Sequence, residues 1–167
     1  LEAGGDSIEH GTYLNRESIR LMRRNGAYLV PTVLAGVTVA ELAETADFMT
    51  DNQRAKSREV GPVMLEMARR AHEGGVTIAF GTDSGVSRHG LNAREFELLV
   101  EAGLTPMEAI VTATINASRH LQMDSDIGTI EAGKLADIIA VDGNPLENIS
   151  ELREMGFVMQ GGEVYRD

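Results

Sequence analysis

The chain has 167 residues, of which 43% are hydrophobic and 25% charged, a balance typical of a soluble globular protein and not of a disordered one. The 26 acidic residues outnumber the 15 basic ones, and the net charge of −11 argues against nucleic acid or an anionic membrane surface as a partner. The chain has no cysteine, which excludes disulfides and thiolate metal sites, and it shows no signal peptide or membrane-spanning run, so we expect a cytoplasmic protein.

The first residues, LEAGGDSIEHG, contain a signal for the C-terminal end of a helix, but no helix can be predicted before it. Gly4 and Gly5 are typical of a helix C-cap, where a left-handed residue is needed, yet the few residues before them are too short a segment to form a helix. We therefore expect this sequence to be the C-terminal part of a longer protein.

Three short strands, each followed by helix, are predicted over the first part of the chain. Strands are expected at 7–9, at 28–30 before Pro31, and over the apolar run 76–80. Helices are expected at 15–24, from Thr50 to His72, at 91–103 and from Thr105 to about Leu121. Residues 32–49 are small and apolar with weak periodicity, and they fit either a loop or a loose helix. Strands that alternate with helices predict an α/β fold with a parallel sheet.

The boundaries of these helices rest on capping signals. Asn15 is a plausible N-cap of the first helix, which Asn25-Gly26 ends. Capping boxes are predicted for the later helices, from Thr50 with Gln53, Asn92 with Glu95, and Thr105 with Glu108. Gly61-Pro62 predicts a kink in the long helix, which Gly74-Gly75 ends.

The character of the sequence changes near residue 125. From Gly128 the segment GTIEAGKLADIIAVDGNPL has turn signals on either side of the β-rich run 136–141. The final FVMQGGEVYRD is typical of two strands joined at Gly161-Gly162, a hairpin signal. We therefore predict two domains, an α/β part over 1–125 and a small β part over 126–167.

Polar residues directly follow the carboxyl ends of the predicted strands: His10 the first, Pro31-Thr32 the second and Asp83 the third. In parallel α/β folds, sites are built at this end of the sheet, so we expect His10 and Asp83 to face the same space. Imidazole and carboxylate are both good zinc ligands, and a carboxylate can also act as a base. Each residue alone also fits a simpler role, His10 as a hydrogen-bonded turn residue and Asp83 as an Asx-turn former.

The other histidines give weaker signals. His72 and His120 lie near predicted helix C-termini, where imidazolium complements the helix dipole, and we predict structural roles for them. His89, in the loop after the third strand, fits function and structure about equally. The chain has no HxH or HExxH pair, no GxSxG elbow and no glycine-rich phosphate loop, so a complete metal site cannot be drawn from it.

Four segments in order, SIEHGT, GTDSG, TPMEAIVTATINASRHL and GTIEAGKLADIIAVDGNPL, resemble the C-terminal half of metal-dependent amidohydrolases, over essentially the whole chain. More narrowly, the chain resembles the imidazolonepropionase-related group, which includes Xaa-Pro dipeptidases. The resemblance implies a (β/α)8 barrel of the TIM type joined to a small β-sandwich. It implies that residues 1–125 supply barrel strands six to eight and that 126–167 supply the C-terminal share of the sandwich. Turn and strand roles are predicted for the motif residues Gly128, Gly133, Lys134 and Asp137.

The resemblance also implies roles for individual residues near the strand ends. His10 matches a metal ligand, and Asp83 matches an aspartate that contacts metal and shuttles the proton. Tyr13 is a candidate for substrate binding or carbonyl polarisation, against an equal chance of plain packing. Arg88 and His89 are candidates for meeting a substrate carboxylate, Arg88 by bidentate pairing.

The implied cofactor is a divalent metal, zinc, as a binuclear centre in the complete enzyme. The implied substrate is a small peptide or amide whose C–N bond is hydrolysed, as by a dipeptidase or carboxypeptidase. The family's HxH pair, lysine and further histidine are absent, so the chain alone is expected to be inactive and to need the N-terminal half of the barrel. Open strand edges also predict a homo-oligomer. The alternatives are a non-catalytic half-barrel that mediates association and a cyclic amide hydrolase of the imidazolonepropionase type.

Overall fold

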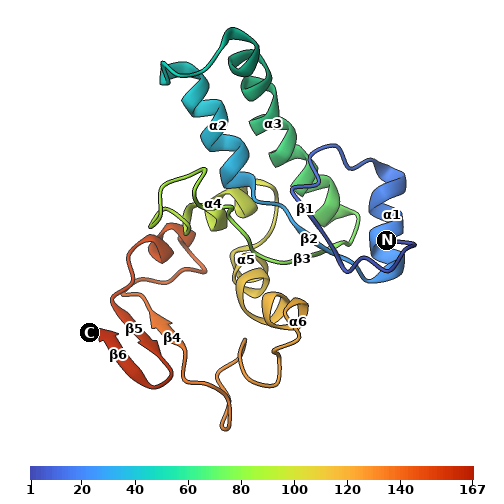
Figure 1. Ribbon diagram of the computed structural model, residues 1–167. Coiled ribbons are helices and arrows are strands. Elements are labelled where there is room, and N and C mark those ends of the chain that lie inside the picture. The colour runs from blue at the N-terminus through green and yellow to red at the C-terminus, as the bar shows by residue number, and fades with distance from the viewer.

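The computed structural model describes all residues from 1 to 167. A three-stranded sheet lies at the centre, a pair of long helices projects from it, and a second three-stranded sheet lies at the C-terminal end (Figure 1). No helix combines the length and the apolar character needed to cross a bilayer.

The central sheet has the strand order β1-β2-β3, and both neighbouring pairs are parallel, which confirms the predicted α/β fold. Strands β1 (Ser7–Glu9) and β2 (Tyr28–Val30) have the predicted bounds. Because the strands are parallel and adjacent, their carboxyl ends lie at the same edge of the sheet.

Strand β3 (Thr77–Ile78) is shorter than the predicted run 76–80, and a helical segment binds its last residue and the backbone that follows. The Phe80 N–H donates to the carbonyl of Thr112 at 3.0 Å. The Asn116 side-chain amide donates to the carbonyl of Ile78 at 2.9 Å. The outer edge of β3 is therefore partly occupied within the chain itself.

Helix α1 (Arg16–Asn25) begins at the predicted cap. The side-chain oxygen of Asn15 accepts the N–H groups of Glu17 at 3.0 Å and Ser18 at 2.9 Å. The buried face of α1, with Met22 fully covered, joins Leu29 of β2 in the main hydrophobic core. This packing fixes the helix against the strand pair that it connects.

Residues 33–45, for which the sequence left a loop or a loose helix open, form helix α2 (Val33–Thr45). Helix α3 (Asp51–Glu73) starts at the confirmed capping box of Thr50 and Gln53, and it continues through Pro62. Together α2 and α3 form the helical pair that rises from the body of the molecule (Figure 1).

Small residues let α2 and α3 approach closely. A Cβ added to Gly61 would lie 3.2 Å from the Gly36 carbonyl oxygen and 3.1 Å from the Ala40 Cβ. A Cβ added to Gly36 would collide with the side chain of Met64. Because small residues line this contact, α2 lacks the strong apolar stripe from which a helix is normally predicted.

Helix α4 (Arg94–Glu101) does not start at a capping box, so the prediction for Asn92 and Glu95 is wrong. The Asn92 amide donates to Thr82 Oγ1 at 3.1 Å, and its oxygen accepts the Gly90 N–H within the preceding loop. Glu95 is fully buried and binds the start of α2 instead. A contact between residues far apart in sequence thus overrides the local capping pattern.

Residues 106–120 form the predicted helical region with an irregular turn inside it. Helix α5 (Pro106–Val111) starts at the confirmed capping box of Thr105 and Glu108. A π-helical turn, η1 (Thr112–Asn116), precedes the short helix α6 (Ala117–His120). The first and last residues of η1 are the two that bind the backbone after β3.

The C-terminal region holds an antiparallel sheet in the order β4-β5-β6. Its elements are β4 (Ile138–Ala140), the 3₁₀ helix η2 (Ile149–Arg153), β5 (Phe157–Gln160) and β6 (Glu163–Arg166). Strands β5 and β6 form the hairpin predicted around Gly161-Gly162. The division into domains at residue 125, the barrel strand numbers and the sandwich stay predictions.

The motif residues of this region lie in turns and bends or directly before β4, and none of them lies within a strand. Lys134 Nζ donates to Thr129 Oγ1 at 2.6 Å and closes the loop before β4. The Asp137 carboxylate accepts the Gly161 N–H at 2.7 Å, which joins the hairpin turn to the start of β4. Gly128 and Gly133 lie in a bend and a turn.

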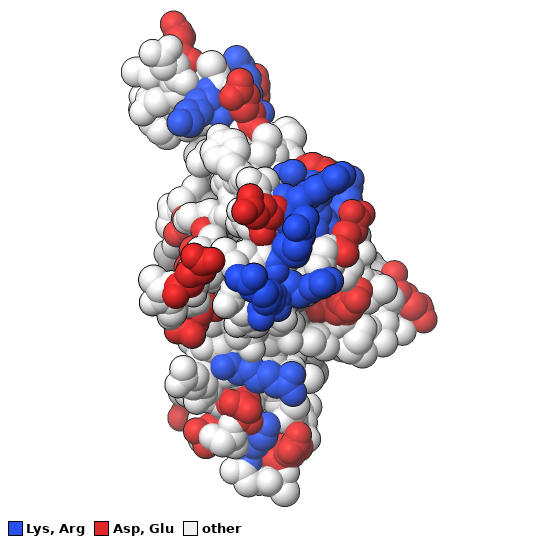
Figure 2. Space-filling view, turned by 90° about the vertical axis from the view of Figure 1, so that its right-hand side faces the viewer, with Lys and Arg blue, Asp and Glu red and all other residues white.

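The charge of −11 is unevenly distributed over the surface. Figure 2 shows basic side chains gathered on the side of the molecule where α1 lies. Helix α1 contributes the exposed residues Arg16, Arg20, Arg23 and Arg24. This face is therefore basic, although the chain as a whole has a negative net charge.

Candidate active site

The three strand ends share an uncommon backbone conformation. Four residues other than glycine have a positive φ, and three of them follow the strands: His10 at 64°, Thr32 at 48° and Asp83 at 50°. The fourth is Gln122, in the turn after α6. The left-handed region is rarely adopted by residues with a Cβ, and for a β-branched threonine it is an outlier. Such positions persist where their surroundings hold them, and they concentrate at functional sites.

The His10 side chain is bound to the end of the second strand. Its Nδ1 lies 2.6 Å from Thr32 Oγ1, and its backbone N–H donates to the Val30 carbonyl at 2.9 Å. Thr32 is buried, whereas His10 is exposed and its Nε2 has no hydrogen-bond partner. The hydrogen-bonded turn that the sequence also allowed is therefore present, and it leaves one ring nitrogen available.

Asp83 presents a free carboxylate. The turn that it opens is closed by its backbone carbonyl, which accepts the Val86 N–H at 3.2 Å. Its side chain is exposed and accepts no hydrogen bond, so the Asx-turn alternative is wrong. The side chains that hold this loop are Thr82 and Ser84, whose hydroxyls lie 3.0 Å apart, together with Asn92.

Gly81 lets the segment that leads to Asp83 pass against the end of β2. A Cβ at Gly81 would collide with the Val30 side chain and would lie 3.6 Å from Thr32 Cγ2. Thr32 therefore contacts His10 on one side and lies beside the backbone before Asp83 on the other. The ends of all three strands meet around this threonine.

The three candidates for substrate binding lie in loops at this end of the sheet. Tyr13, between β1 and α1, is 72% exposed in this chain, and its role stays a prediction. Arg88 and His89 are exposed in the loop between β3 and α4, and neither side chain has an ion-pair partner. Arg88 also lines a cavity of about 340 Å³ between that loop and α2.

Two donors at the strand ends are too few for a complete metal site. No group of three or more His, Asp or Glu side chains converges anywhere in the 167 residues. His10 and Asp83 nevertheless offer an unpartnered imidazole nitrogen and an unpartnered carboxylate, which are the donor types that zinc prefers. The residues present fit a divalent metal in kind, and at least two more ligands would be needed.

Glu95 holds the backbone next to this site and does not form the capping box predicted for it with Asn92. Its carboxylate accepts the N–H groups of Val33 at 3.0 Å and Leu34 at 2.7 Å, directly after Thr32. Burial raises the pKa of the Glu95 carboxyl from 4.5 to about 7, and the two backbone N–H groups oppose this rise. A helical face shared with Leu98 and Leu99 is the sequence signal of its burial.

The substitution Glu95→Gln should make the stability of the protein less dependent on pH. The folded carboxyl keeps its proton up to about pH 7, whereas the unfolded one loses it near 4.5, so the stability due to Glu95 falls as pH rises between these values. The loss across this window is about 3 kcal/mol. Because glutamine does not titrate, the difference in unfolding free energy between the variant and wild type should depend on pH. Between about pH 5 and about pH 8 it should shift in favour of the variant by up to about 3 kcal/mol.

Urea denaturation at both pH values measures this difference. Glu101→Gln is the matched control, since it changes an exposed carboxyl on the same helix, and it should alter stability by less than about 0.5 kcal/mol. A gap between wild type and Glu95→Gln that is the same at both pH values would mean that the buried carboxyl is already ionised at the lower one.

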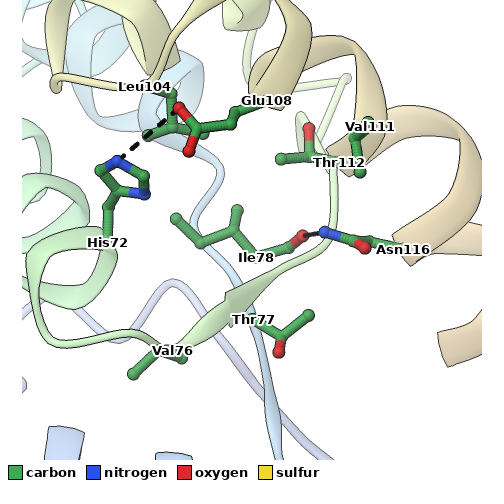
Figure 3. Close-up of a pocket in the computed structure, with 9 residues that line it drawn as sticks. All are labelled: His72, Val76, Thr77, Ile78, Leu104, Glu108, Val111, Thr112 and Asn116. Atoms are coloured by element: carbon green, nitrogen blue, oxygen red, sulfur yellow. Dashed lines mark hydrogen bonds and ion pairs between the residues drawn. The ribbon is translucent and has the colours of Figure 1, made fainter.

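A separate pocket of about 290 Å³ lies along β3 rather than beyond its end (Figure 3). In it the ring of His72, from the last turn of α3, lies 3.9 Å from the Glu108 carboxylate. None of the predicted site residues lines this pocket. The ring of His120 packs on that of Tyr28, with centroids 4.9 Å apart. Both histidines lie in the last turn of their helices, as predicted, and their structural role stays a prediction.

Several known proteins similar to this chain are named as hydrolases. Residues 1–165 match the Amidohydrolase family. The crystal structure of a Xaa-Pro dipeptidase with bound methionine in its active site is 46% identical, with a TM-score of 0.95, over 99% of this chain and 41% of that one. The ochratoxinase of Aspergillus niger is 33% identical over 99% of this chain and 35% of its own length. The imidazolonepropionase of Symbiobacterium thermophilum is 39% identical over 43% of this chain and 18% of its own length. The chain thus spans well under half the length of these relatives.

Proposed function

This chain belongs to the amidohydrolase family, and from that premise we propose that it is the C-terminal part of a metal-dependent hydrolase that cleaves a C–N bond. The proposed substrates are dipeptides with proline in second position. The likeness of the whole chain to a Xaa-Pro dipeptidase supports this substrate class.

The observation that carries the proposal is the left-handed backbone of His10 and Asp83 beyond the ends of two strands of a parallel sheet. An exposed histidine and an exposed aspartate would each be unremarkable on a protein surface. Both adopt a conformation that residues with a Cβ avoid, and both side chains keep an unpartnered donor atom. Left-handed residues other than glycine concentrate at functional sites, and this supports a binding role for the two free donor atoms.

In the proposed enzyme, His10 through Nε2 and Asp83 through its carboxylate hold zinc, as part of a binuclear centre completed by ligands from outside this chain. Zinc held there would supply the Lewis acidity that activates water and polarises the scissile carbonyl. Asp83 accepts the proton of the attacking water and delivers it to the leaving nitrogen, so that the amine departs neutral. Its exposed carboxylate, free of hydrogen bonds, suits this transfer.

In this proposal the substrate is bound by three loop residues, Tyr13, Arg88 and His89. The exposed hydroxyl of Tyr13 donates a hydrogen bond to the substrate carbonyl. Arg88 pairs with the carboxylate of the dipeptide through its two parallel N–H groups, and His89 lies next to it in the same loop. All three require the rest of the barrel wall, so this chain alone is proposed to be inactive and to assemble with the N-terminal half and into homo-oligomers.

The protein extended to the length of its relatives should release proline from Xaa-Pro dipeptides, and a chelator should abolish this activity. Added zinc should restore it, because the chelator removes the metal and leaves His10 and Asp83 in place. Proline release and metal content measured on the same sample test this. Turnover that survives complete metal removal would contradict the metal dependence, and intact dipeptides with a loaded metal site would contradict the substrate class.

A further inference from the structure

Thr32 is the residue before α2, and its side chain does not cap that helix. A threonine at this position normally accepts the N–H of the second or third residue of the helix. Here no such bond forms, because the left-handed backbone at φ 48° turns the hydroxyl away from the helix. The hydroxyl is instead engaged with Pro31 and His10.

Glu95 takes over the capping of α2. Its two carboxylate oxygens accept the first two N–H groups of the helix, from Val33 and Leu34. Two of the N-terminal donors of α2 are thereby satisfied without the threonine hydroxyl. A buried carboxylate from α4 thus caps α2 in place of the Thr32 hydroxyl. The Thr32 side chain is therefore free to contact His10.

The hydrogen-bond geometry at Thr32 favours one tautomer of His10. A threonine hydroxyl has one proton, and Thr32 Oγ1 donates it to the Pro31 carbonyl at 2.8 Å. Toward His10 the same oxygen therefore acts as the acceptor, so Nδ1 of the ring carries a proton across the 2.6 Å contact. In the neutral ring this leaves the lone pair on Nε2.

We propose that Thr32 is a positioning residue that fixes the tautomer and direction of His10, so that Nε2 is the atom offered to metal. This inference rests on the proposed function of His10 as a metal ligand. Metal-binding histidines commonly donate their other ring N–H to a fixed oxygen, and loss of that partner typically weakens metal binding by about 10–100-fold. Thr32 provides such an oxygen, held in place by its own strained backbone and by Glu95 behind it.

Three substitutions in the complete protein test this role. Thr32→Val keeps the β-branched shape but removes the hydroxyl. Thr32→Gly also removes the hydroxyl, and it suits the left-handed backbone, so it stays informative if the valine variant does not fold. Thr32→Ser keeps the hydroxyl. Zinc affinity is measured by competition with a chelator, and the tautomer of His10 is read by ¹⁵N NMR on the metal-free protein at alkaline pH, with His10→Asn to assign the signal.

We expect Thr32→Val and Thr32→Gly to bind zinc about 10–100-fold more weakly and to show Nε2 of His10 partly protonated. Thr32→Ser should keep the Nδ1-protonated ring and bind within about 3-fold of wild type. Wild-type affinity and an unchanged tautomer in the hydroxyl-free variants would overturn the inference. If His10→Asn itself leaves zinc binding intact, the proposed function fails instead, so the two failures can be told apart.

Discussion

Replacing Asp83 with asparagine in the complete protein is expected to lower kcat by about 10⁴-fold or more, while much of the metal stays bound. An amide has nearly the shape of the carboxylate, and its oxygen can still approach a cation. It cannot accept the proton of the attacking water or return one to the leaving nitrogen. Loss of a general base alone costs about 10²–10⁴-fold, and the weakened metal contact adds to that loss.

Steady-state kinetics and metal analysis on the same preparation measure both effects of Asp83→Asn. Asp47→Asn is a suitable control, because Asp47 is an exposed carboxylate in the loop between α2 and α3, and it should leave kcat unchanged. Near-normal kcat in Asp83→Asn would mean that Asp83 only shapes the turn closed by Val86. A complete loss of metal would make Asp83 mainly a ligand and only secondarily a base.

Replacing His10 with alanine is expected to remove both metal and activity. The Nε2 atom would be a direct donor, so its loss should weaken zinc binding by more than the about 10–100-fold that follows from loss of an outer partner. The effect should exceed that of Thr32→Gly, and this order of affinities distinguishes a ligand from the residue that positions it. Metal content after dialysis and zinc affinity by chelator competition provide the comparison.

Two further variants separate ligand loss from other causes in the His10 experiment. His10→Asn removes the imidazole but tolerates the left-handed backbone, so any effect that it shares with alanine does not come from strain. His72→Gln alters a histidine that faces Glu108 away from the strand ends, and it should leave metal and turnover nearly intact. If His10→Ala retains its zinc, the metal site lies elsewhere.

The parts of the fold that could be predicted from sequence are those fixed by local hydrogen bonds. Asn15, Thr50 and Thr105 cap their helices through residues two or three positions away, and this spacing is visible in the chain. Helix α2 escaped prediction because its packing depends on Gly36 meeting Gly61, a contact that no local pattern records. Glu95 was misread for the same reason, since its partners lie 61 and 62 residues away.

The candidate site shows the same limit. The positions of His10 and Asp83 follow from the rule that sites form beyond the ends of parallel strands, which needs only the order of strands and helices. The bond from His10 to Thr32 spans 22 residues and joins two residues with left-handed backbone, and neither feature can be predicted from the residue types. Sequence therefore indicated the chemistry at the site but not the side chain that orients it.

The segment bound at the end of β3 leaves β1 as the more open edge of the central sheet. A strand added beside β3 would need the N–H of Phe80, which has a single proton and already donates it to Thr112. On the opposite side, the alternation of a parallel strand directs the backbone groups of Ser7 and Glu9 away from β2, while Asp6 and His10 bind toward it. While this chain is separated from the rest of its proposed barrel, edge-to-edge stacking through β3 is thus disfavoured, and pairing between copies of this sheet should occur first at β1.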